Sequence, residues 1–293
     1  MSGKWLSFGR FALAAAVAVF MIPAGGTAGA SMAAADAAGA EVVLTYKMPS
    51  GRILRYETKE DGLETMDMMG QVVETTSVSS SRFSLEPKGL RDVNHLLGVT
   101  IEDLTVAIVS MQGDVSPDVK PVLGRSFEMV LSPLGVEVDV SGAEAITYTT
   151  LSGTRNLASG FKAFFPDLPD RPVKVGDSWP SDFVIEEKTE SVDIRIEGQN
   201  VHTLEGFETV DGMECARIVA KVSGTVMGTG FQQGMDLRFD GTLTGTDVWY
   251  FAPAEGVYVM STSDSETDMT ISVAGMSIPS KSKRTGEVRL AGK

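Results

Sequence analysis

Residues 235–273 have the sequence MDLRFDGTLTGTDVWYFAPAEGVYVMSTSDSETDMTISV, and this stretch decides the fold. In its first half, apolar side chains occupy odd positions and polar side chains occupy even positions. The second half repeats this alternation after the turn-like residues 252–256. Alternation with a period of two predicts strands that bury one face, and the short glycine-containing loop predicts a hairpin. The apolar positions are Met235, Leu237, Phe239, Leu243, Trp249, Phe251, Val257, Val259, Met269, Ile271 and Val273.

The register of this hairpin follows from the same pattern. If Phe251 pairs with Val257, each apolar position of one strand faces an apolar or small residue of the other. Both strands exceed the usual length. Several positions on the apolar face are small, namely Gly241, Gly245, Ser261, Ser263 and Ser265. These gaps predict a sheet that curls and leaves its concave face incompletely filled, where a hydrophobic guest or a covering helix can lie.

Strand patterns continue on both sides of this hairpin. They consist of alternating or β-branched runs bounded by turn residues, and the run at 99–111 is apolar on both faces. We therefore expect a mainly β fold, with a long, strongly curled antiparallel sheet that forms a half-barrel or open barrel. The segments concerned are 42–46, 53–59, 72–85, 99–111, 127–131, 136–140, 192–197 and 216–222.

Residues 143–165 differ in kind from the rest of the chain. Apolar residues stand there at i, i+4, i+7 and i+8, the spacing of one helical face: Leu157, Phe161, Phe164 and Phe165. Pro166 ends the pattern, and the sheet offers the apolar surface that such a helix covers. A helix on a membrane surface is the alternative, but Arg155 and Lys162 give its polar face little positive charge.

Residues 1–30 have the features of a signal peptide. Lys4 and Arg10 begin it, the apolar run at 11–22 is too short to span a bilayer, and residues 28–30 fit a cleavage site. No cysteine follows the run for lipid attachment. We expect an exported, soluble protein, periplasmic or secreted, that is not lipid-anchored and has no transmembrane segment after signal removal. Residues 31–40 form a flexible leader.

The rest of the chain divides at RPVKVGDSW, residues 171–179. Residues 41–170 form an N-terminal β-rich half that ends in the helix, and residues 171–293 form a long-stranded C-terminal half. The two halves are expected to share one sheet. Proline and Gly-Asp give the dividing stretch the chemistry of a turn. We interpret Trp179 as a plug that holds this connector on the sheet rather than as a ligand anchor. Whether the halves are a true repeat stays open.

Charge and composition exclude several functions. The formal net charge is −14; removing residues 1–30 takes away two basic and no acidic residues, which gives −16. Nucleic acids and anionic membranes need a basic surface, so neither is expected as a partner. Cys215 is the only cysteine, and its strand-like setting predicts a buried, inert thiol. The isolated His95 and His202 give neither a zinc set nor a hydrolase triad, so we expect no enzyme and no cofactor.

Two weaker patterns suggest metal ligands. Acidic residues on the polar face of the 235–273 hairpin could offer oxygen ligands to Ca²⁺: Asp240, Asp264, Glu266 and Asp268. A solvated acidic face that discourages aggregation is the simpler interpretation. A methionine cluster resembles a soft-metal patch for Cu(I): Met66, Met68 and Met69. Filling of irregular gaps in the core explains such methionines more simply.

The turn Pro172–Trp179 (PVKVGDSW) carries a resemblance. The chain resembles an uncharacterised family of exported bacterial β-rich proteins that have a P-V-x-x-G-D-x-W turn between two β-rich halves. More distantly, long curled strands with a helix on the concave side are similar in architecture to the half-barrels of periplasmic lipoprotein and lipid carriers. Neither resemblance assigns a ligand residue to this chain.

The pattern as a whole favours a non-enzymatic protein that binds a hydrophobic ligand, such as a lipid or acyl chain, on the concave face. Six aromatic or aliphatic side chains would line that site: Phe239, Leu243, Trp249, Phe251, Phe161 and Phe165. The alternative is a structural or interaction module of the bacterial envelope, whose partner is another envelope protein. An open cavity on the concave face would favour the first hypothesis, and a filled one the second.

Overall fold

The structure is a computed structural model that describes residues 40–111, 113–150, 153–232 and 234–291. The predicted signal peptide (1–30) and nearly all of the predicted leader (31–40) lie outside the described residues. Within the described residues, no helix has the length and apolar character needed to cross a membrane.

The described chain is mainly β, as the alternation predicts. Twelve strands form one antiparallel sheet in the order β6-β5-β3-β2-β1-β14-β13-β12-β11-β10-β9, with β4 paired to β3, and β7 and β8 form a separate ribbon. The strands are β1 Leu54–Met68, β2 Gln71–Arg91, β3 Asn94–Ser110, β4 Gly113–Val115, β5 Ser126–Leu131, β6 Glu137–Asp139, β7 Thr147–Thr150, β8 Gly153–Asn156, β9 Ser178–Lys188, β10 Val192–Val210, β11 Met213–Gln232, β12 Met235–Ala252, β13 Val257–Val273 and β14 Met276–Ala291.

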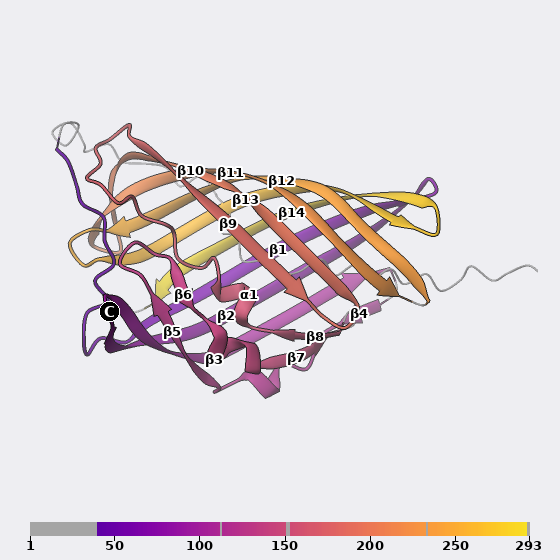
Figure 1. Ribbon diagram of the computed structural model, residues 1–293, viewed down its shortest axis with the longest axis horizontal. Helices are drawn as coiled ribbons and strands as arrows, with labels where there is room; N and C mark the ends of the chain where they lie inside the picture. Colours follow the sequence, from indigo (N-terminus) through magenta and orange to yellow (C-terminus); the bar gives the residue numbers. More distant parts are fainter. Residues whose placement is uncertain (1–39, 112, 151–152, 233, 292–293) are drawn as a thin grey trace, which may run out of the picture.

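The sheet curls but does not close, so β6 and β9 are its two edge strands. Figure 1 shows the long strands sloping across the molecule, with the short helix α1 (Ala158–Phe161) and the β7–β8 ribbon near its middle. Glycines allow the curvature where neighbouring strands approach closely. Gly198 and Gly224 pair across β10 and β11, and a Cβ atom on Gly198 would overlap the carbonyl oxygen of Ser223.

The centre of the sheet joins the two halves of the chain. β1 pairs with β14 over the register Arg55–Ala291 to Met66–Ser280. Strands from residues 41–170 and strands from residues 171–293 therefore belong to one continuous sheet.

The predicted β12–β13 hairpin is present, but its predicted register is wrong. Phe251 pairs with Tyr258 instead of Val257, and an irregularity at Tyr250 shifts the rest of the ladder so that Trp249 faces Ser261. The extra residue lets three successive side chains near the turn, from Val257 onward, be buried. Beyond the irregularity odd positions again face odd positions, so the predicted apolar face is retained.

Two local predictions are wrong. Residues 42–46 do not form a strand, and only Val42 makes an isolated bridge, to Val173. The predicted helix over 157–165 shrinks to α1, and residues 147–150 and 153–156 form the β7–β8 ribbon instead. The phenylalanines that suggested one helical face contact different walls: Phe161 packs on Phe83 and Phe127, Phe164 on Tyr56, and Phe165 on Tyr46. An irregular segment can direct its side chains toward several surrounding strands and loops, whereas a straight helix presents them on one face.

The core has two apolar clusters along the inner face of the sheet. The larger contains the phenylalanines of residues 161–165 together with Trp249, Phe251 and the strand ends near them. The smaller lies toward the other ends of the strands and contains Phe239 and Leu243. Met66 of β1 and Ile185 of the edge strand β9 belong to this smaller cluster, so the curled sheet packs on itself there.

Candidate ligand site at the seam of the sheet

A row of small and polar residues crosses the inner face of the sheet. The pairing of seven strands, from β10 to β2 in the order of the sheet, aligns its members, and we call them the polar row: His202, Ala220, Asp247, Ser263, Gly286, Glu60 and Ser79. Every polar side chain of the row is at most 9% exposed. Buried polar groups usually have hydrogen-bond partners, so such a row requires an explanation.

Several atoms of the polar row have no hydrogen-bond partner. They are Nδ1 of His202, Oδ1 of Asp247, Oγ of Ser263 and Oε2 of Glu60. Nε1 of Trp249, next to the row, also has no hydrogen-bond partner. Each unpaired buried polar atom costs on the order of 1–3 kcal/mol. Their gathering in one part of the inner face therefore indicates space for water or for a polar ligand group.

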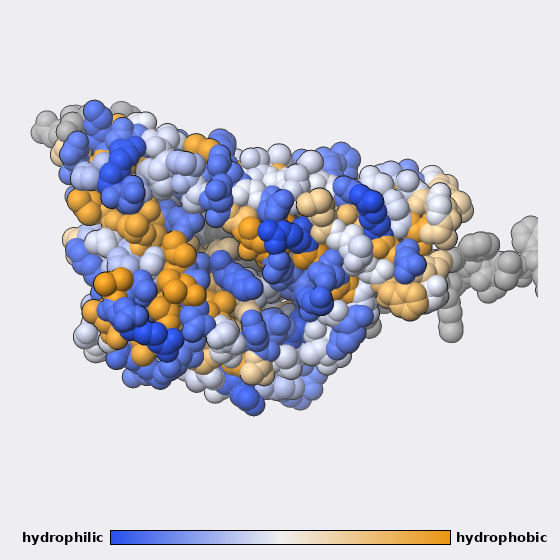
Figure 2. Space-filling view, viewed as in Figure 1, coloured by the Kyte–Doolittle hydropathy of each residue, from blue (hydrophilic) through white to orange (hydrophobic). Residues whose placement is uncertain are grey.

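A cavity of about 220 Å³ opens onto one end of the polar row. It lies where the sheet fails to close, between the edge strands β6 and β9, with residues 162–167 as its third wall; we call it the seam cavity. Figure 2 shows this face of the molecule, where apolar and polar side chains border a recess near the middle. The lining residues are Val136, Glu137, Lys162, Ala163, Phe164, Phe165, Pro166, Asp167, Asp182, Phe183, Val184, Asn200, His202, Asp247 and Trp249.

Burial makes three carboxyl groups of the cavity weaker acids, those of Asp247, Glu137 and Asp167. Burial raises the pKa of Asp247 to about 7, and the nearby hydroxyl of Ser263 opposes this shift without reaching hydrogen-bond geometry. Burial also raises the pKa of Glu137 to about 8, although its Oε1 accepts a 2.8 Å hydrogen bond from the backbone N–H of Phe165. The pKa of Asp167 is raised by burial as well. Low solvation thus disfavours negative charge in the cavity.

His202 is held as a neutral imidazole. Burial lowers the pKa of His202 to about 4. Its ring stacks on Trp179 at 5.5 Å and meets Trp249 edge-on at 5.7 Å between centroids, and its Nε2 lies 2.9 Å from Oγ of Ser181 on β9. These contacts fix the plane of the ring and leave Nδ1 as its unpaired nitrogen.

The turn at residues 171–179 positions this part of the site. Gly176 has φ +95°, which glycine adopts without strain, and Asp177 accepts the 3.1 Å backbone hydrogen bond of Lys174 that closes the turn. Trp179 then enters the core at 6% exposure and donates from Nε1 to the carbonyl oxygen of Asp167 over 3.0 Å. Trp179 thus links β9 to the segment that walls the cavity, a packing role.

Two buried ion pairs lie farther along the inner face. Arg284 of β14 donates to Oε1 of Glu60 over 2.8 Å, and Arg155 of β8 lies 3.7 Å from Glu187 of β9. Close by, Ser280 donates to Glu64 over 3.0 Å, and burial raises the pKa of Glu64 to about 6. The polar region therefore extends across the whole concave face between the two apolar clusters.

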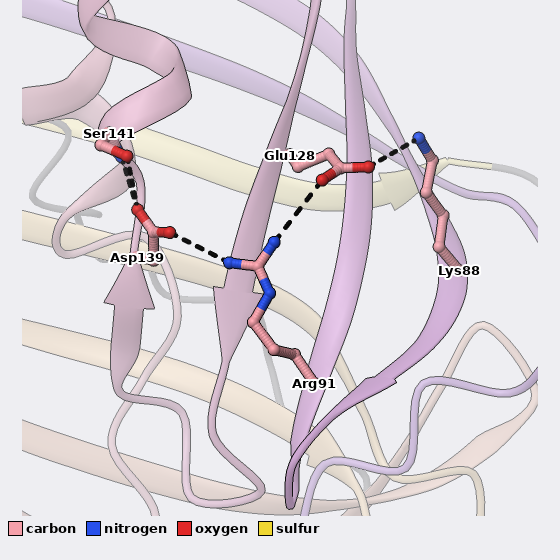
Figure 3. A network of polar contacts seen from close by, with 5 residues as sticks. All are labelled: Lys88, Arg91, Glu128, Asp139 and Ser141. Carbon is pink, nitrogen blue, oxygen red and sulfur yellow. Dashed lines mark hydrogen bonds and ion pairs between the residues drawn. The ribbon is translucent and has the colours of Figure 1, made fainter.

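An exposed polar network stiffens the β6 side of the seam (Figure 3). Arg91 of β2 pairs with Asp139 of β6 at 3.2 Å and with Glu128 of β5 at 3.6 Å, and Lys88 lies 3.3 Å from Glu128. Asp139 also accepts from the hydroxyl and backbone N–H of Ser141, which lowers its pKa. Exposed pairs contribute little stability each, but the network fixes the short edge strand beside the cavity.

The six residues predicted to line one ligand site lie in different parts of the structure. Trp249 and Phe165 line the seam cavity. Phe251 contacts Tyr46 edge-on at 5.1 Å, and Phe161 packs against Phe83, so both serve the larger cluster. The remaining two, Phe239 and Leu243, lie in the smaller cluster. Sequence reasoning missed Asp247, although the signal was present: a carboxylate occupies an odd position, where the alternation places core residues.

The metal-site candidates are arranged as follows. Glu266 and Asp268 lie on the outer face and pair with Lys283 and Lys281 at 2.6 and 2.8 Å, and Asp240 pairs with Arg238 at 2.8 Å. In the described part of the chain, no three His, Cys, Asp or Glu side chains gather as a metal site. The methionine cluster that resembles a copper patch is divided, because Met66 is buried in the smaller cluster and Met69 is exposed at a turn. Cys215 is buried, and burial raises its pKa to about 12.

Comparison with known proteins adds little to this picture. No protein-family model and no curated protein matches the chain. Among solved structures, an outer membrane channel from Pseudomonas putida F1 aligns with 11% identity over 84% of this chain and 97% of that chain, at a TM-score of 0.26. A DUF1329 family protein from Desulfovibrio piger aligns with 10% identity over 80% and 85%, at a TM-score of 0.16. OmpT, an outer membrane protein of Vibrio cholerae, gives 11% identity, 82% and 97% coverage, and a TM-score of 0.18. Scores this low carry no argument about function.

Proposed function

We propose that this chain is an exported, non-enzymatic binding protein that holds a small amphipathic molecule in the seam cavity. The observation that carries the proposal is the gathering of unpaired buried atoms in His202, Asp247 and Trp249, three residues that line an open cavity. A ligand with a polar group at these atoms would satisfy them. Its apolar part would lie against the phenylalanines of the same wall.

The size of the cavity narrows the class of ligand. Its 220 Å³ is below the range of about 300–1,000 Å³ that is typical of sites for drug-sized ligands. A second pocket, lined in part by Phe83, Arg155 and Phe161, has a volume of only about 80 Å³. A small molecule or a head group suits these volumes better than a complete acyl chain.

Native mass spectrometry tests the proposal on protein purified from its own host, before and after extraction with organic solvent. Wild-type protein should carry an extractable adduct. Ala163→Phe places a ring into the cavity and should abolish the adduct, whereas the matched control Ala254→Phe, at an exposed turn, should keep it. An adduct that survives Ala163→Phe would place the ligand elsewhere. Water alone in the cavity, with no adduct on any variant, would contradict the proposal.

A second candidate function, an interaction module of the envelope, is supported by the hairpin tips. The turns after β1, β11 and β13 lie at the same end of neighbouring hairpins. In or beside these turns, Met69, Phe231 and Met276 are exposed at 89%, 58% and 41%, and Figure 2 shows apolar residues at the right-hand end of the molecule. Cross-linking in envelope extract should give a partner band that the double variant Met69→Ser/Phe231→Ser loses. A band that the double variant retains would contradict this function.

A further inference from the structure

We propose that the ligand of the seam cavity is a small organic cation, an ammonium group with N–H donors on an aromatic or aliphatic body. This inference rests on the proposed function and adds the charge and hydrogen-bonding character of the ligand. It follows from three properties of the cavity wall: its charge balance, its unpaired acceptors and its aromatic rings.

The charge balance of the wall is acidic. Four carboxyl groups line the cavity, and one ammonium group, that of Lys162, accompanies them. Lys162 and Asp182 are exposed, whereas Asp247 is buried, so the deep end of the cavity holds a carboxyl group without a cationic neighbour in the lining. A cationic ligand would stabilise the ionised form of these carboxyl groups, and an anionic ligand would favour their protonated form.

The unpaired atoms of this region include two candidate acceptors, on His202 and Asp247, beside the donor Nε1 of Trp249 and the hydroxyl of Ser263. Nε2 of His202 lies 2.9 Å from the hydroxyl oxygen of Ser181, and we assign Nε2–H as the donor of this hydrogen bond. This assignment leaves Nδ1 of His202 as a bare acceptor. Oδ1 of Asp247 is the second acceptor, and the two residues flank the small Ala220 in the polar row. An ammonium group offers N–H donors to both.

Aromatic rings supply the remaining wall. Trp249, Phe164, Phe165 and Phe183 line the cavity. Their faces attract a cation by roughly 0.5–2 kcal/mol per contact, more where water is excluded, and they bury the apolar body of the ligand. A carboxylate flanked by aromatic faces is a suitable environment for an alkyl- or arylammonium ion.

Binding of a cation should release a proton. At pH 6 the raised pKa of Asp247, about 7, keeps this carboxyl protonated in the free protein. When the ammonium ion binds, the Asp247 proton leaves to solvent and the carboxylate pairs with the ligand. The other titratable groups facing this end are His202, which stays neutral, and Glu137, Asp167, Asp182 and Lys162 of the cavity wall. Tyr258, beneath Asp247, stays protonated because burial raises its pKa.

The test uses three probes of similar size: 2-phenylethylammonium, 2-phenylethanol and 3-phenylpropionate. Isothermal titration calorimetry of the wild-type protein measures the Kd of each probe. The Kd of the ammonium probe should fall about tenfold per pH unit from pH 5 to 7 and then level off. The alcohol should bind at least tenfold more weakly at pH 8, without this pH dependence, and the carboxylate more weakly still.

Asp247→Asn should flatten the pH dependence of the ammonium probe, and Asp240→Asn, on the exposed face of the same strand, should leave it unchanged. If Asp247→Asn does not fold, calorimetry of wild-type protein in two buffers of different ionisation enthalpy measures the proton release directly, with about one proton per ligand expected at pH 6. Equal or tighter binding of the alcohol or the carboxylate would overturn the cation inference alone. Binding of none of the three probes would count against the proposed function itself.

Discussion

Replacing Asp247 by asparagine should change how stability depends on pH. The pKa of this carboxyl is raised from 3.8 to about 7 in the folded protein, because burial disfavours the charged form. Folded protein therefore binds a proton that unfolded protein has lost between about pH 4 and pH 7. The stability associated with the protonated group is present below pH 4 and is lost as the pH rises toward 7.

The magnitude follows from the shift. A change of about three pKa units corresponds to roughly 4 kcal/mol at about 1.4 kcal/mol per unit. Wild-type protein should thus lose about 4 kcal/mol relative to Asp247→Asn between pH 4 and pH 8. Because the exposed carboxylates are common to both proteins, their contributions cancel in the difference.

Urea denaturation followed by tryptophan fluorescence at pH 4, 5, 6, 7 and 8 measures this difference. Asp240→Asn, on the exposed face of β12, is the control and should follow the wild-type profile. Parallel profiles of wild type and Asp247→Asn would refute the reasoning, since they would mean that Asp247 titrates alike in the folded and unfolded states.

Three further perturbations test other parts of the structure. Phe164→Ala should destabilise by about 3–5 kcal/mol, because Phe164 is 2% exposed among five aromatic neighbours. Phe231→Ala, at a residue that is 58% exposed, should stay within about 0.5 kcal/mol in the same urea assay. Gly198→Ala should lower the free energy of unfolding by about 1–3 kcal/mol, because the new Cβ atom would overlap the Ser223 carbonyl oxygen. Gly206→Ala, on the same strand and with open space around its Cβ position, should have no such effect. Equal effects of the two substitutions would contradict the close approach of β10 and β11. Cys215 should resist a maleimide in native protein at pH 7.5 and react fully in urea, because burial raises its pKa to about 12; rapid native labelling would show that β11 opens.

The sequence predicted the β class and the buried face of the longest hairpin, because period-two alternation is a local property. Leu243 and Trp249 are buried as that pattern requires. The register near the turn could not be predicted in this way. The irregularity beside Tyr250 changes which residues pair across the hairpin, but it does not change the order of apolar and polar residues within each strand. The sequence pattern is therefore compatible with more than one pairing.

The candidate site could be predicted only in part, because its cavity depends on contacts between distant segments. The sequence contains Asp247 at a core position, which marks it as unusual. Nothing local indicates that β6 and β9 stay unpaired, or that residues 162–167 cross the gap between them. The apolar residues at 157–165 are spaced three or four positions apart, as on one face of a helix. The same spacing occurs in this irregular segment, whose rings contact several different strands and loops.

The pairing of β1 with β14 has a consequence for how this molecule is made. The two strands at the middle of the sheet are separated by more than two hundred positions in the sequence. The pairing of Tyr56 with Leu290 can therefore form only after the C-terminal strand has been synthesised. Such long-range closure makes folding slow, since the entropy of a large loop is lost before the contacts form. During synthesis, the nascent polypeptide would remain without its central ladder until the last strand emerges. A chaperone that shields the apolar edge of β1 during this delay would raise the yield of native protein.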